Sequence, residues 1–171
     1  MRSGQIIVTG ASRGIGEAIA VELDRRGFAV AGLSRSGVSV VGTGYACDMT
    51  DERAIADAIA KVAAEGPLIG LINNAGAHES KRSAELSLAD FETTMRLNAS
   101  AVMVACRESY PHLKAAGDAL IVNIGSFFDK LAVIDNLAYC ASKAAVGAIT
   151  RCLAAEWARD GIRVLDVAPG Y

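Results

Sequence analysis

The sequence predicts an α/β protein in which a doubly wound parallel sheet of about six strands is covered by helices on both faces. Short apolar runs bounded by Gly, Asn or Ser alternate along the chain with longer segments whose apolar residues recur at helical spacing. In addition, the first apolar run leads into a glycine-rich turn and an amphipathic segment, the order expected where a doubly wound sheet begins.

The expected strands are the short apolar runs, and the expected helices are the longer segments between them. The strands are placed at 5–9, 28–34, 44–47, 68–73, 119–125 and 162–167. The helices are placed at 14–26, 51–64, 88–115 and 137–160. Right-handed crossovers would wind these units into the doubly wound sheet.

Two of the helices carry signals for a buried face and for an end. The 51–64 segment has three apolar residues at helical spacing, and Thr50 or Asp51 can cap its first turn. The 137–160 segment has a longer apolar stripe, and Gly161 is expected to end it in the left-handed conformation. The stripes consist of Ile55, Ile59 and Val62 in the first helix and of Val146, Ile149, Leu153 and Trp157 in the second.

One connection differs from the regular pattern. Residues 35–43 are too short and too rich in β-branched residues for a crossover helix, so we expect a loop or a single turn there. The prolines Pro67, Pro111 and Pro169 are expected where an element starts, breaks or has just ended. With no internal repeat or linker in the sequence, residues 1–171 are predicted to form a single domain.

The composition argues against several classes of function. The 171 residues include 17 Lys and Arg against 19 Asp and Glu, for a formal net charge of −2. This balance lacks the basic excess of a nucleic-acid-binding surface, and no apolar run is long enough to span a membrane. Residues 1–4 lead directly into a strand and leave no room for a secretory signal, so we expect a cytoplasmic protein.

The cysteines and histidines do not have the spacing of metal ligands. The cysteines contain no CxxC pair, and buried thiols in a reducing compartment are expected rather than zinc or redox chemistry. His78 and His112 each lack a ligand-spaced partner, so no metal site is predicted. The cysteines are Cys47, Cys106, Cys140 and Cys152.

The turn after the first strand has the features of a dinucleotide phosphate site. Gly10 allows a sharp turn, Gly14 allows close approach of the backbone to a pyrophosphate, and Gly16 allows a helix to pack closely on the strand. Free N–H groups at the start of the helix would face the anion. A tight connection without a ligand is the alternative. Ser12, Arg13 and Ile15 complete the candidate cofactor-binding residues of the turn.

The end of the second strand favours NADP(H) over NAD(H). A carboxylate there would bind the adenine-ribose 2′-hydroxyl, but the sequence has Ser34 and Arg35, a hydroxyl and a cation suited to a 2′-phosphate. Arg13 adds a second positive charge. Alternatively, both arginines are solvated surface charges.

The motifs together resemble the short-chain dehydrogenase/reductase family, in their order and spacing, from the first strand to the last residue. Each motif alone is common, whereas the combination is specific. The motifs are Thr9-Gly-x-x-x-Gly14-x-Gly16, Asn73-Asn74-Ala75-Gly76, Asn98, Ser126, Tyr139-x-x-x-Lys143 and Pro169-Gly170.

Residues of this set can also be interpreted from their chemistry. Tyr139 and Lys143 lie four positions apart on one helix, so their side chains point the same way. A nearby ammonium favours the phenolate and would bring Tyr139 closer to the working range for proton transfer. Such a pair is often only a surface helical pair, but Ser126 is expected at the carboxyl end of the fifth strand, where open α/β sheets bind ligands.

We therefore expect reduction of a carbonyl, or its reverse, with four catalytic residues. Ser126 would hold and polarise the carbonyl oxygen, and Tyr139 would supply the proton while the nicotinamide supplies the hydride. The resemblance implies that Lys143 also binds the nicotinamide ribose and that Asn98 holds a water in a proton relay. A structural Asn at a helix kink is the alternative for Asn98.

The resemblance implies further contacts to the cofactor. Asn74, Ala75 and Gly76 would line its adenosine side and brace the central strand. Asp48, with Met49, would contact the adenine, although an ordinary Asx turn is an alternative for Asp48. The resemblance also assigns Tyr139, Lys143, Pro169 and Gly170 to the nicotinamide end of the cofactor.

Two departures from the family pattern limit this interpretation. The 35–43 connection lacks a crossover helix, which leaves the placement of Arg35 open. Family members continue beyond Pro169-Gly170 with a substrate lid and a seventh strand, which the 171 residues do not include. A dinucleotide-binding module without efficient catalysis of its own is therefore the alternative function. A sugar-nucleotide epimerase fits less well, because its glycine turn usually has a different spacing.

The expected partners are a small carbonyl or alcohol substrate and further copies of the chain. Apolar residues on the two long helices, including Val102, Leu153 and Trp157, suggest a homodimer or homotetramer, with a buried monomeric core as the alternative. Five residues are candidates for the substrate pocket, which would suit an apolar molecule with one polar end. They are Phe127, Phe128, Leu131, His78 and Glu79.

Overall fold

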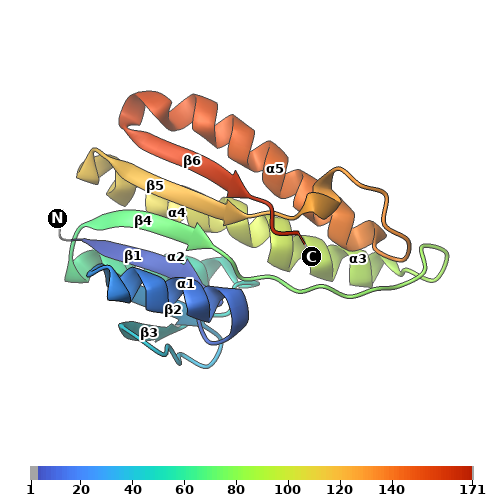
Figure 1. Ribbon diagram of the computed structural model, residues 1–171, viewed down its shortest axis with the longest axis horizontal. Coiled ribbons are helices and arrows are strands. Elements are labelled where there is room, and N and C mark those ends of the chain that lie inside the picture. The colour runs from blue at the N-terminus through green and yellow to red at the C-terminus, as the bar shows by residue number, and fades with distance from the viewer. Residues whose placement is uncertain (1–3, 171) are drawn as a thin grey trace.

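Six parallel strands form one sheet in the order β3-β2-β1-β4-β5-β6, which confirms the predicted doubly wound α/β fold (Figure 1). The computed structural model describes residues 4–170. Residues 1–3 and Tyr171 lie outside the described residues. The expected absence of a secretory signal rests partly on residues 1–3. The strands are Gln5–Thr9 (β1), Ala29–Ser34 (β2), Thr43–Ala46 (β3), Leu68–Asn73 (β4), Ala119–Ile124 (β5) and Ile162–Val167 (β6).

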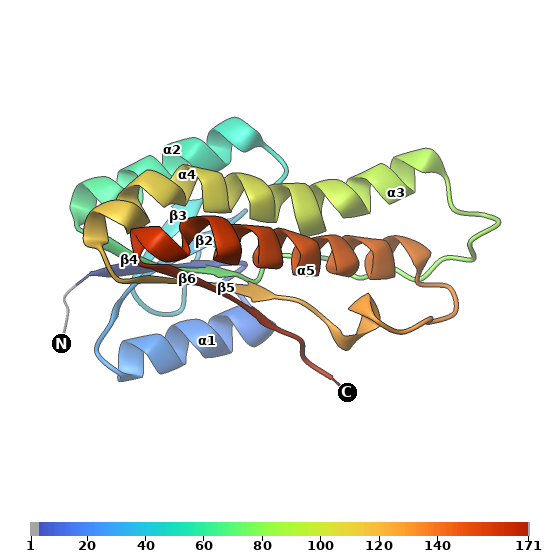
Figure 2. The ribbon, with the colours of Figure 1, turned by 90° about the horizontal axis from the view of Figure 1, so that it is seen from above.

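The helices cover the two faces of the sheet unequally. Helix α1 lies alone on one face, whereas α2, α4 and α5 lie together on the other (Figure 2). The helices are Gly14–Arg25 (α1), Glu52–Glu65 (α2), Leu88–Met95 (α3), Ala101–Ala116 (α4) and Leu137–Trp157 (α5). Shorter helical segments are the π-helical Arg96–Ser100 (η1) and the 3-10 turns Phe127–Asp129 (η2) and Ala158–Asp160 (η3).

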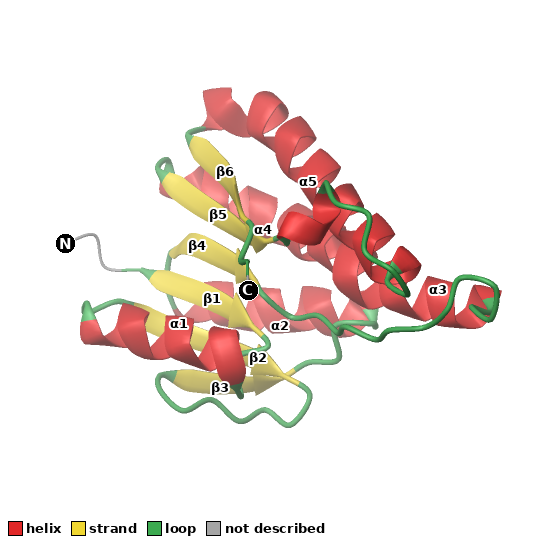
Figure 3. Cartoon of the chain, turned by 45° about the vertical axis from the view of Figure 1, so that its right-hand side comes forward, coloured by secondary structure: helices red, strands yellow, loops and turns green. Residues whose placement is uncertain are grey.

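The first strand lies in the centre of the sheet, between β2 and β4. Ile7 pairs with Ala31 on one side and with Leu71 on the other. The chain thus builds one half of the sheet outward from β1 and then returns to build the other half from β4. Because all strands are parallel, their carboxyl ends meet at one edge (Figure 3), and the point where the winding reverses is where such sheets bind ligands.

The core lies mainly on the three-helix face of the sheet. The side chains of Ile7, Leu71, Ile121 and Val146 are fully buried there. The predicted apolar faces of α2 and α5 pack against this core, and Asp51 caps α2 by accepting hydrogen bonds from two backbone N–H groups. Gly161 has the expected left-handed conformation after η3, with φ of 74°.

The segment predicted as one helix at 88–115 is helical throughout, but the π-helical η1 divides it into α3 and α4. Pro111 was expected at the edge of an element but lies inside α4. A proline removes one backbone donor, yet α4 continues because residues on both sides of it, including Cys106 and Leu113, are fully buried against the sheet. The irregularity falls instead at η1, a π-helical turn that contains Asn98.

The structure corrects the expectation that Val102 and Trp157 offer apolar surface to another copy of the chain. Val102 belongs to the core of the chain and is only 5% exposed, so it offers no apolar surface to another copy. Trp157 is half-buried and stacks on Tyr110 of α4, with ring centroids 4.7 Å apart. The expected homodimer or homotetramer stays a prediction.

Cys47 and Cys106 are buried as expected, but Cys140 is partly exposed and Cys152 is exposed.

The connection at 35–43 contains no helix, as predicted. The chain turns back immediately after β2, where Gly37 N and Cys47 N both donate to the carbonyl of Ser34. This short return keeps β3 beside β2 without a crossover helix. No helix among residues 4–170 is long and apolar enough to cross a membrane.

The central strands should dominate the stability of the fold. Ile121 of β5 is fully buried, so Ile121→Ala should lower the free energy of unfolding by about 2–5 kcal/mol through lost burial and a residual cavity. Ile134→Ala is the matched control, because Ile134 is 86% exposed. Urea denaturation followed by circular dichroism measures both. Equal losses for the two variants would contradict the placement of the core.

Candidate active site

The glycine-rich turn between β1 and α1 leaves an open surface at the carboxyl edge of the sheet. Gly14 has φ of 61°, and an added Cβ would meet no atom within 4 Å. At Gly16, in contrast, an added Cβ would lie 2.3 Å from the carbonyl oxygen of Gly10. Gly16 is therefore needed for packing of the turn, whereas Gly14 faces space into which a ligand can approach.

The start of α1 is suited to an anion. Its N-cap is Arg13, an extended residue whose side chain makes no capping hydrogen bond. The N–H groups of the first helical turn have no intrahelical acceptors, and none is capped by the Arg13 side chain. Arg13 and Ile15 are exposed and Ser12 is half-buried. These features fit the phosphate groups of a dinucleotide, which helix N-termini bind through backbone N–H groups.

Thr9 and Asn74 hold the turn against the neighbouring strand β4. The Thr9 hydroxyl accepts hydrogen bonds from the N–H groups of Asn74 and Ala75, each at 3.0 Å. The side-chain amide of Asn74 donates to the Thr9 carbonyl at 3.0 Å and, more weakly, to that of Gly10 at 3.4 Å. The Asn74 side chain thus braces the turn, and Gly76 lies beside Asn98.

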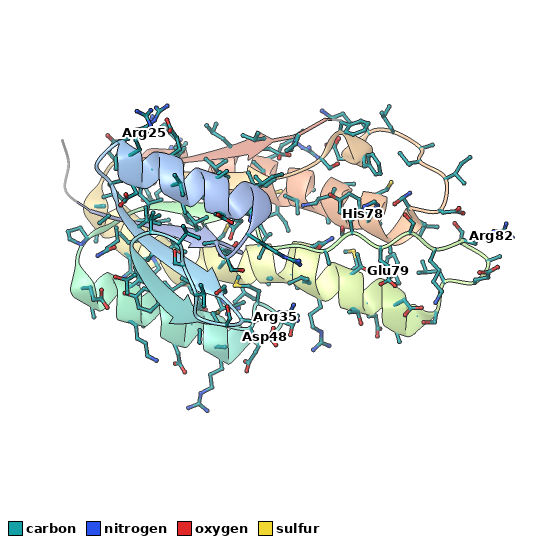
Figure 4. All side chains as sticks on the ribbon, turned by 60° about the horizontal axis from the view of Figure 1, so that its bottom comes forward. Arg25, Arg35, Asp48, His78, Glu79 and Arg82 are labelled. Atoms are coloured by element: carbon teal, nitrogen blue, oxygen red, sulfur yellow. The ribbon has the colours of Figure 1, made fainter. Side chains whose placement is uncertain are left out.

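The ends of β2 and β3 bring Arg35 and Asp48 to the same edge of the sheet (Figure 4). Arg35 is exposed, whereas the Ser34 hydroxyl is buried and donates to the Val38 carbonyl at 3.0 Å. Asp48 accepts two hydrogen bonds from Thr50, the geometry of an Asx turn. These bonds hold the pKa of the Asp48 carboxyl below its usual value, and the charge of Arg35 acts in the same direction.

Asn98 lies in η1 and connects three elements. Its side-chain amide donates to the Ala77 carbonyl at 2.8 Å, and its oxygen accepts from the Ala77 N–H at 2.9 Å. The same amide donates to the Ser142 hydroxyl of α5 at 3.1 Å. Asn98 is 1% exposed, so these contacts satisfy a buried polar group and fix the chain just after β4.

Tyr139 and Lys143 lie on the first two turns of α5, as their spacing predicts. The Lys143 ammonium lies 5.6 Å from the centre of the Tyr139 ring and donates to the Ile124 carbonyl at 2.7 Å. Burial lowers the pKa of Lys143, and the carboxylate of Asp166 partly offsets this shift. A buried ammonium beside a phenol is an arrangement suited to proton transfer.

Ser126 follows the end of β5 and reaches the same region. Its side chain is nine-tenths buried, and its hydroxyl accepts a hydrogen bond from the N–H of Phe128 at 3.2 Å. Phe127 N donates to the Pro169 carbonyl at 3.4 Å, which brings the segment with Gly170 beside Ser126. Ser126 and the Pro169-Gly170 segment therefore lie together, at the carboxyl ends of β5 and β6.

Aromatic side chains surround Tyr139. His78 lies with its ring centre 4.5 Å from that of Tyr139, and Phe128 lies edge-on at 5.7 Å. Phe127 contacts Phe128 in turn, with ring centroids 4.7 Å apart. Leu131 is 53% exposed and lies instead in a separate hollow with Ile134 and Cys140. Glu79 is exposed on the loop next to His78 (Figure 4).

Sequence reasoning missed three polar residues that support this region. Ser142 is fully buried, donates to the Tyr139 carbonyl at 2.7 Å and accepts from Asn98. Asn136, just before α5, accepts a hydrogen bond from Ser80 of the β4–α3 loop and so links the two segments. The charge of Asp166, on β6, acts on the ammonium of Lys143. The available signals were the position of Ser142 within the Tyr-x-x-x-Lys motif and the acidic residue Asp166 within a strand.

Among residues 4–170, no group of three or more His, Cys, Asp or Glu could hold a metal ion.

Comparison with known proteins agrees with the fold and with the family that the sequence resembles. Residues 5–171 match the family model described as short chain dehydrogenase. D-threitol dehydrogenase of Mycolicibacterium smegmatis is 35% identical over 176 residues, which cover 95% of this chain and 68% of that protein. Gluconate 5-dehydrogenase of Gluconobacter oxydans is 33% identical over 184 residues, covering 100% and 72%.

Solved structures give the same result. Aldohexose dehydrogenase of Thermoplasma acidophilum superposes with a TM-score of 0.93 at 29% identity, covering 99% of this chain and 67% of that one. A dehydrogenase/reductase of Sinorhizobium meliloti has a TM-score of 0.90 at 35% identity, covering 99% and 73%. The chain belongs to the short-chain dehydrogenase family, whose members are oxidoreductases that bind a nicotinamide cofactor.

The two glycines of the turn should respond differently to substitution. Gly16→Ala should lower both the free energy of unfolding and cofactor affinity, because its Cβ would overlap the backbone of Gly10. Gly14→Ala should mainly weaken cofactor binding, with a smaller loss of stability of about 1 kcal/mol from its positive φ. Thermal melts and fluorescence titration with NADPH measure the two effects. Equal stability losses, with cofactor affinity unchanged in Gly14→Ala, would contradict this division of roles.

Proposed function

We propose that this chain is an NADP(H)-dependent oxidoreductase that interconverts a ketone or aldehyde and an alcohol. The main support is the arrangement of Tyr139 over the buried ammonium of Lys143 at the carboxyl edge of the sheet. Ser126 reaches the same edge from the end of β5. Family membership supports the reaction class, since relatives are named as dehydrogenases and reductases.

In the proposed reaction, Ser126 and Tyr139 act on the carbonyl oxygen. The Ser126 hydroxyl donates a hydrogen bond that holds and polarises this oxygen. Tyr139 donates its phenolic proton to the same oxygen during reduction and accepts it back during alcohol oxidation. The nicotinamide, when bound, supplies or accepts the hydride at the neighbouring carbon. The rings of His78 and Phe128 would help to exclude water around Tyr139.

Lys143 and Asn98 support the proton transfer in this proposal. The ammonium of Lys143 favours the negative charge that develops on Tyr139, and Lys143 would also bind the nicotinamide ribose. The Asn98 oxygen accepts one hydrogen bond from Ala77 and has the capacity for a second, which fits a relay water. The link from Asn98 through Ser142 to the Tyr139 carbonyl supports this placement.

The cofactor preference rests on Arg35 and Arg13. Both side chains are exposed, one at the end of β2 and the other at the start of α1. The Ser34 hydroxyl supports the preference less, because it already donates to the Val38 carbonyl. Gly10, Gly14, Gly16, Asn74, Ala75 and Gly76 would hold the rest of the dinucleotide, with Asp48 and Met49 at the adenine and Pro169 and Gly170 near the nicotinamide.

Replacing Tyr139 tests the reaction. Tyr139→Phe keeps the aromatic contacts but removes the proton donor, so NADPH-dependent carbonyl reduction should fall by about 10²–10⁴-fold, the usual contribution of a general acid. Fluorescence titration should show that NADPH affinity changes little. Tyr45→Phe is the control, since Tyr45 lies on β3 away from this region. If the unaltered chain binds NADPH but reduces no carbonyl, the alternative of a dinucleotide-binding module holds instead.

Replacing Arg35 tests the cofactor preference. Arg35→Leu should weaken NADPH binding about tenfold, through loss of one charge-assisted hydrogen bond, while affinity for NADH changes little. The effect should shrink as salt increases, because Arg35 is exposed. Arg82→Leu, at another exposed arginine far along the β4–α3 loop (Figure 4), is the matched control. Equal weakening of NADPH and NADH would refute the 2′-phosphate contact.

A further inference from the structure

Asn136 begins the helix that carries Tyr139, but its side chain does not cap that helix. Asparagine is among the most favoured N-cap residues because its oxygen accepts a hydrogen bond from the first helical turn. In α5 this capping hydrogen bond is absent, although Asn136 occupies the N-cap position. The side chain is nine-tenths buried, so its polar atoms need other partners.

The oxygen of Asn136 is used to hold His78 instead. Asn136 Oδ1 accepts a hydrogen bond from His78 Nε2 and another from the Ser80 hydroxyl at 3.3 Å. Asn136 Nδ2 donates to the Ile134 carbonyl at 2.7 Å, which assigns the orientation of the amide. Because Oδ1 can only accept, His78 Nε2 must carry the proton of this hydrogen bond. In the neutral imidazole, Nδ1 is then a hydrogen-bond acceptor.

The imidazole of His78 is fixed directly beside Tyr139. Its ring is tilted by 52° against the Tyr139 ring and meets Phe128 edge-on with centroids 6.0 Å apart. Asn98 clamps both backbone groups of Ala77, the preceding residue, and so fixes the segment that presents His78. Figure 4 shows His78 on the side of its loop that faces α5.

One nitrogen of this fixed ring remains available. Among residues 4–170, no residue hydrogen-bonds to Nδ1 of His78, and the side chain as a whole is exposed. A neutral ring nitrogen that accepts a hydrogen bond selects a ligand group that donates one. A hydroxyl has such a donor, whereas a hydrocarbon, an ether or a second ketone has none.

We propose that His78 recognises a second hydroxyl on the carbon next to the reacting carbon, so that the substrate is a vicinal diol in one direction and an α-hydroxy ketone in the other. This inference rests on the proposed function of Tyr139. The reacting oxygen binds Ser126 and Tyr139, and the neighbouring hydroxyl donates to His78 Nδ1. Asn136 acts as a positioning residue, because it fixes the ring and the protonated nitrogen through Nε2.

Matched pairs of alcohols test the proposal. Oxidation with NADP⁺ is measured for cis-cyclohexane-1,2-diol against cyclohexanol and for butane-2,3-diol against butan-2-ol. The unaltered chain should prefer each diol in kcat/KM. His78→Phe retains an aromatic ring but has no acceptor, so the diol preference should fall about five- to tenfold, the value of one hydrogen bond. His78→Gln, which can still accept through its side-chain oxygen, should keep part of the preference.

The control is the other histidine, because the chain has only two. His112 lies on α4 and is not part of the proposed site, so His112→Phe should leave the diol preference unchanged. Nitrogen-15 NMR of histidine-labelled protein in its NADPH complex gives a second readout without turnover. Added diol should shift the Nδ1 resonance of His78, and the corresponding mono-alcohol should not.

The possible failures can be distinguished. If the chain oxidises both members of each pair with equal kcat/KM, the recognition role of His78 is refuted and the proposed function stands. If His78→Phe lowers kcat/KM for diol and mono-alcohol alike, His78 only supports Tyr139, and the proposal is again refuted. If no alcohol is oxidised and NMR shows no shift with diol, both this inference and the proposed function are wrong.

Discussion

The hydrogen bonds between Thr9 and Asn74 hold together the point on which the rest of the site depends. They join the end of β1 to the end of β4, the two strands between which the winding of the sheet reverses. The glycine-rich turn is fixed by the same contacts, since any Cβ on Gly16 would approach both Asn74 and Gly10. Because these contacts join the two strand ends, the turn and the following β4–α3 loop present their groups from one frame.

Asn98 extends this frame to the helices. Asn98 lies in the π-helical η1 between α3 and α4 and is 1% exposed. It binds Ala77 and Ser142, so the loop after β4 and the helix that carries Tyr139 are tied to one side chain. A structural role at an irregular helix and a role in proton transfer are therefore compatible for this residue.

The sheet and its order were predictable because buried parallel strands are short apolar runs separated by amphipathic helices. The spacing of Tyr139 and Lys143 was equally informative, since helix geometry alone puts them together. The π-helical segment and the uninterrupted helix at Pro111 were not predictable, because tertiary packing overrode local preference in both. The contact between Asn136 and His78 joins two loops 58 residues apart, and no periodic pattern encodes such a pair.

Several departures from local preference occur at the same edge of the sheet. The side chains of Arg13 and Asn136 occupy N-cap positions without making a capping hydrogen bond, and Lys143 is buried although burial lowers its pKa. Each arrangement costs stability that an ordinary cap or an apolar residue would supply. Such costs are retained where a side chain serves a ligand or a reaction. Their location at the carboxyl ends of the strands, where open parallel sheets bind ligands, is consistent with the proposed active site.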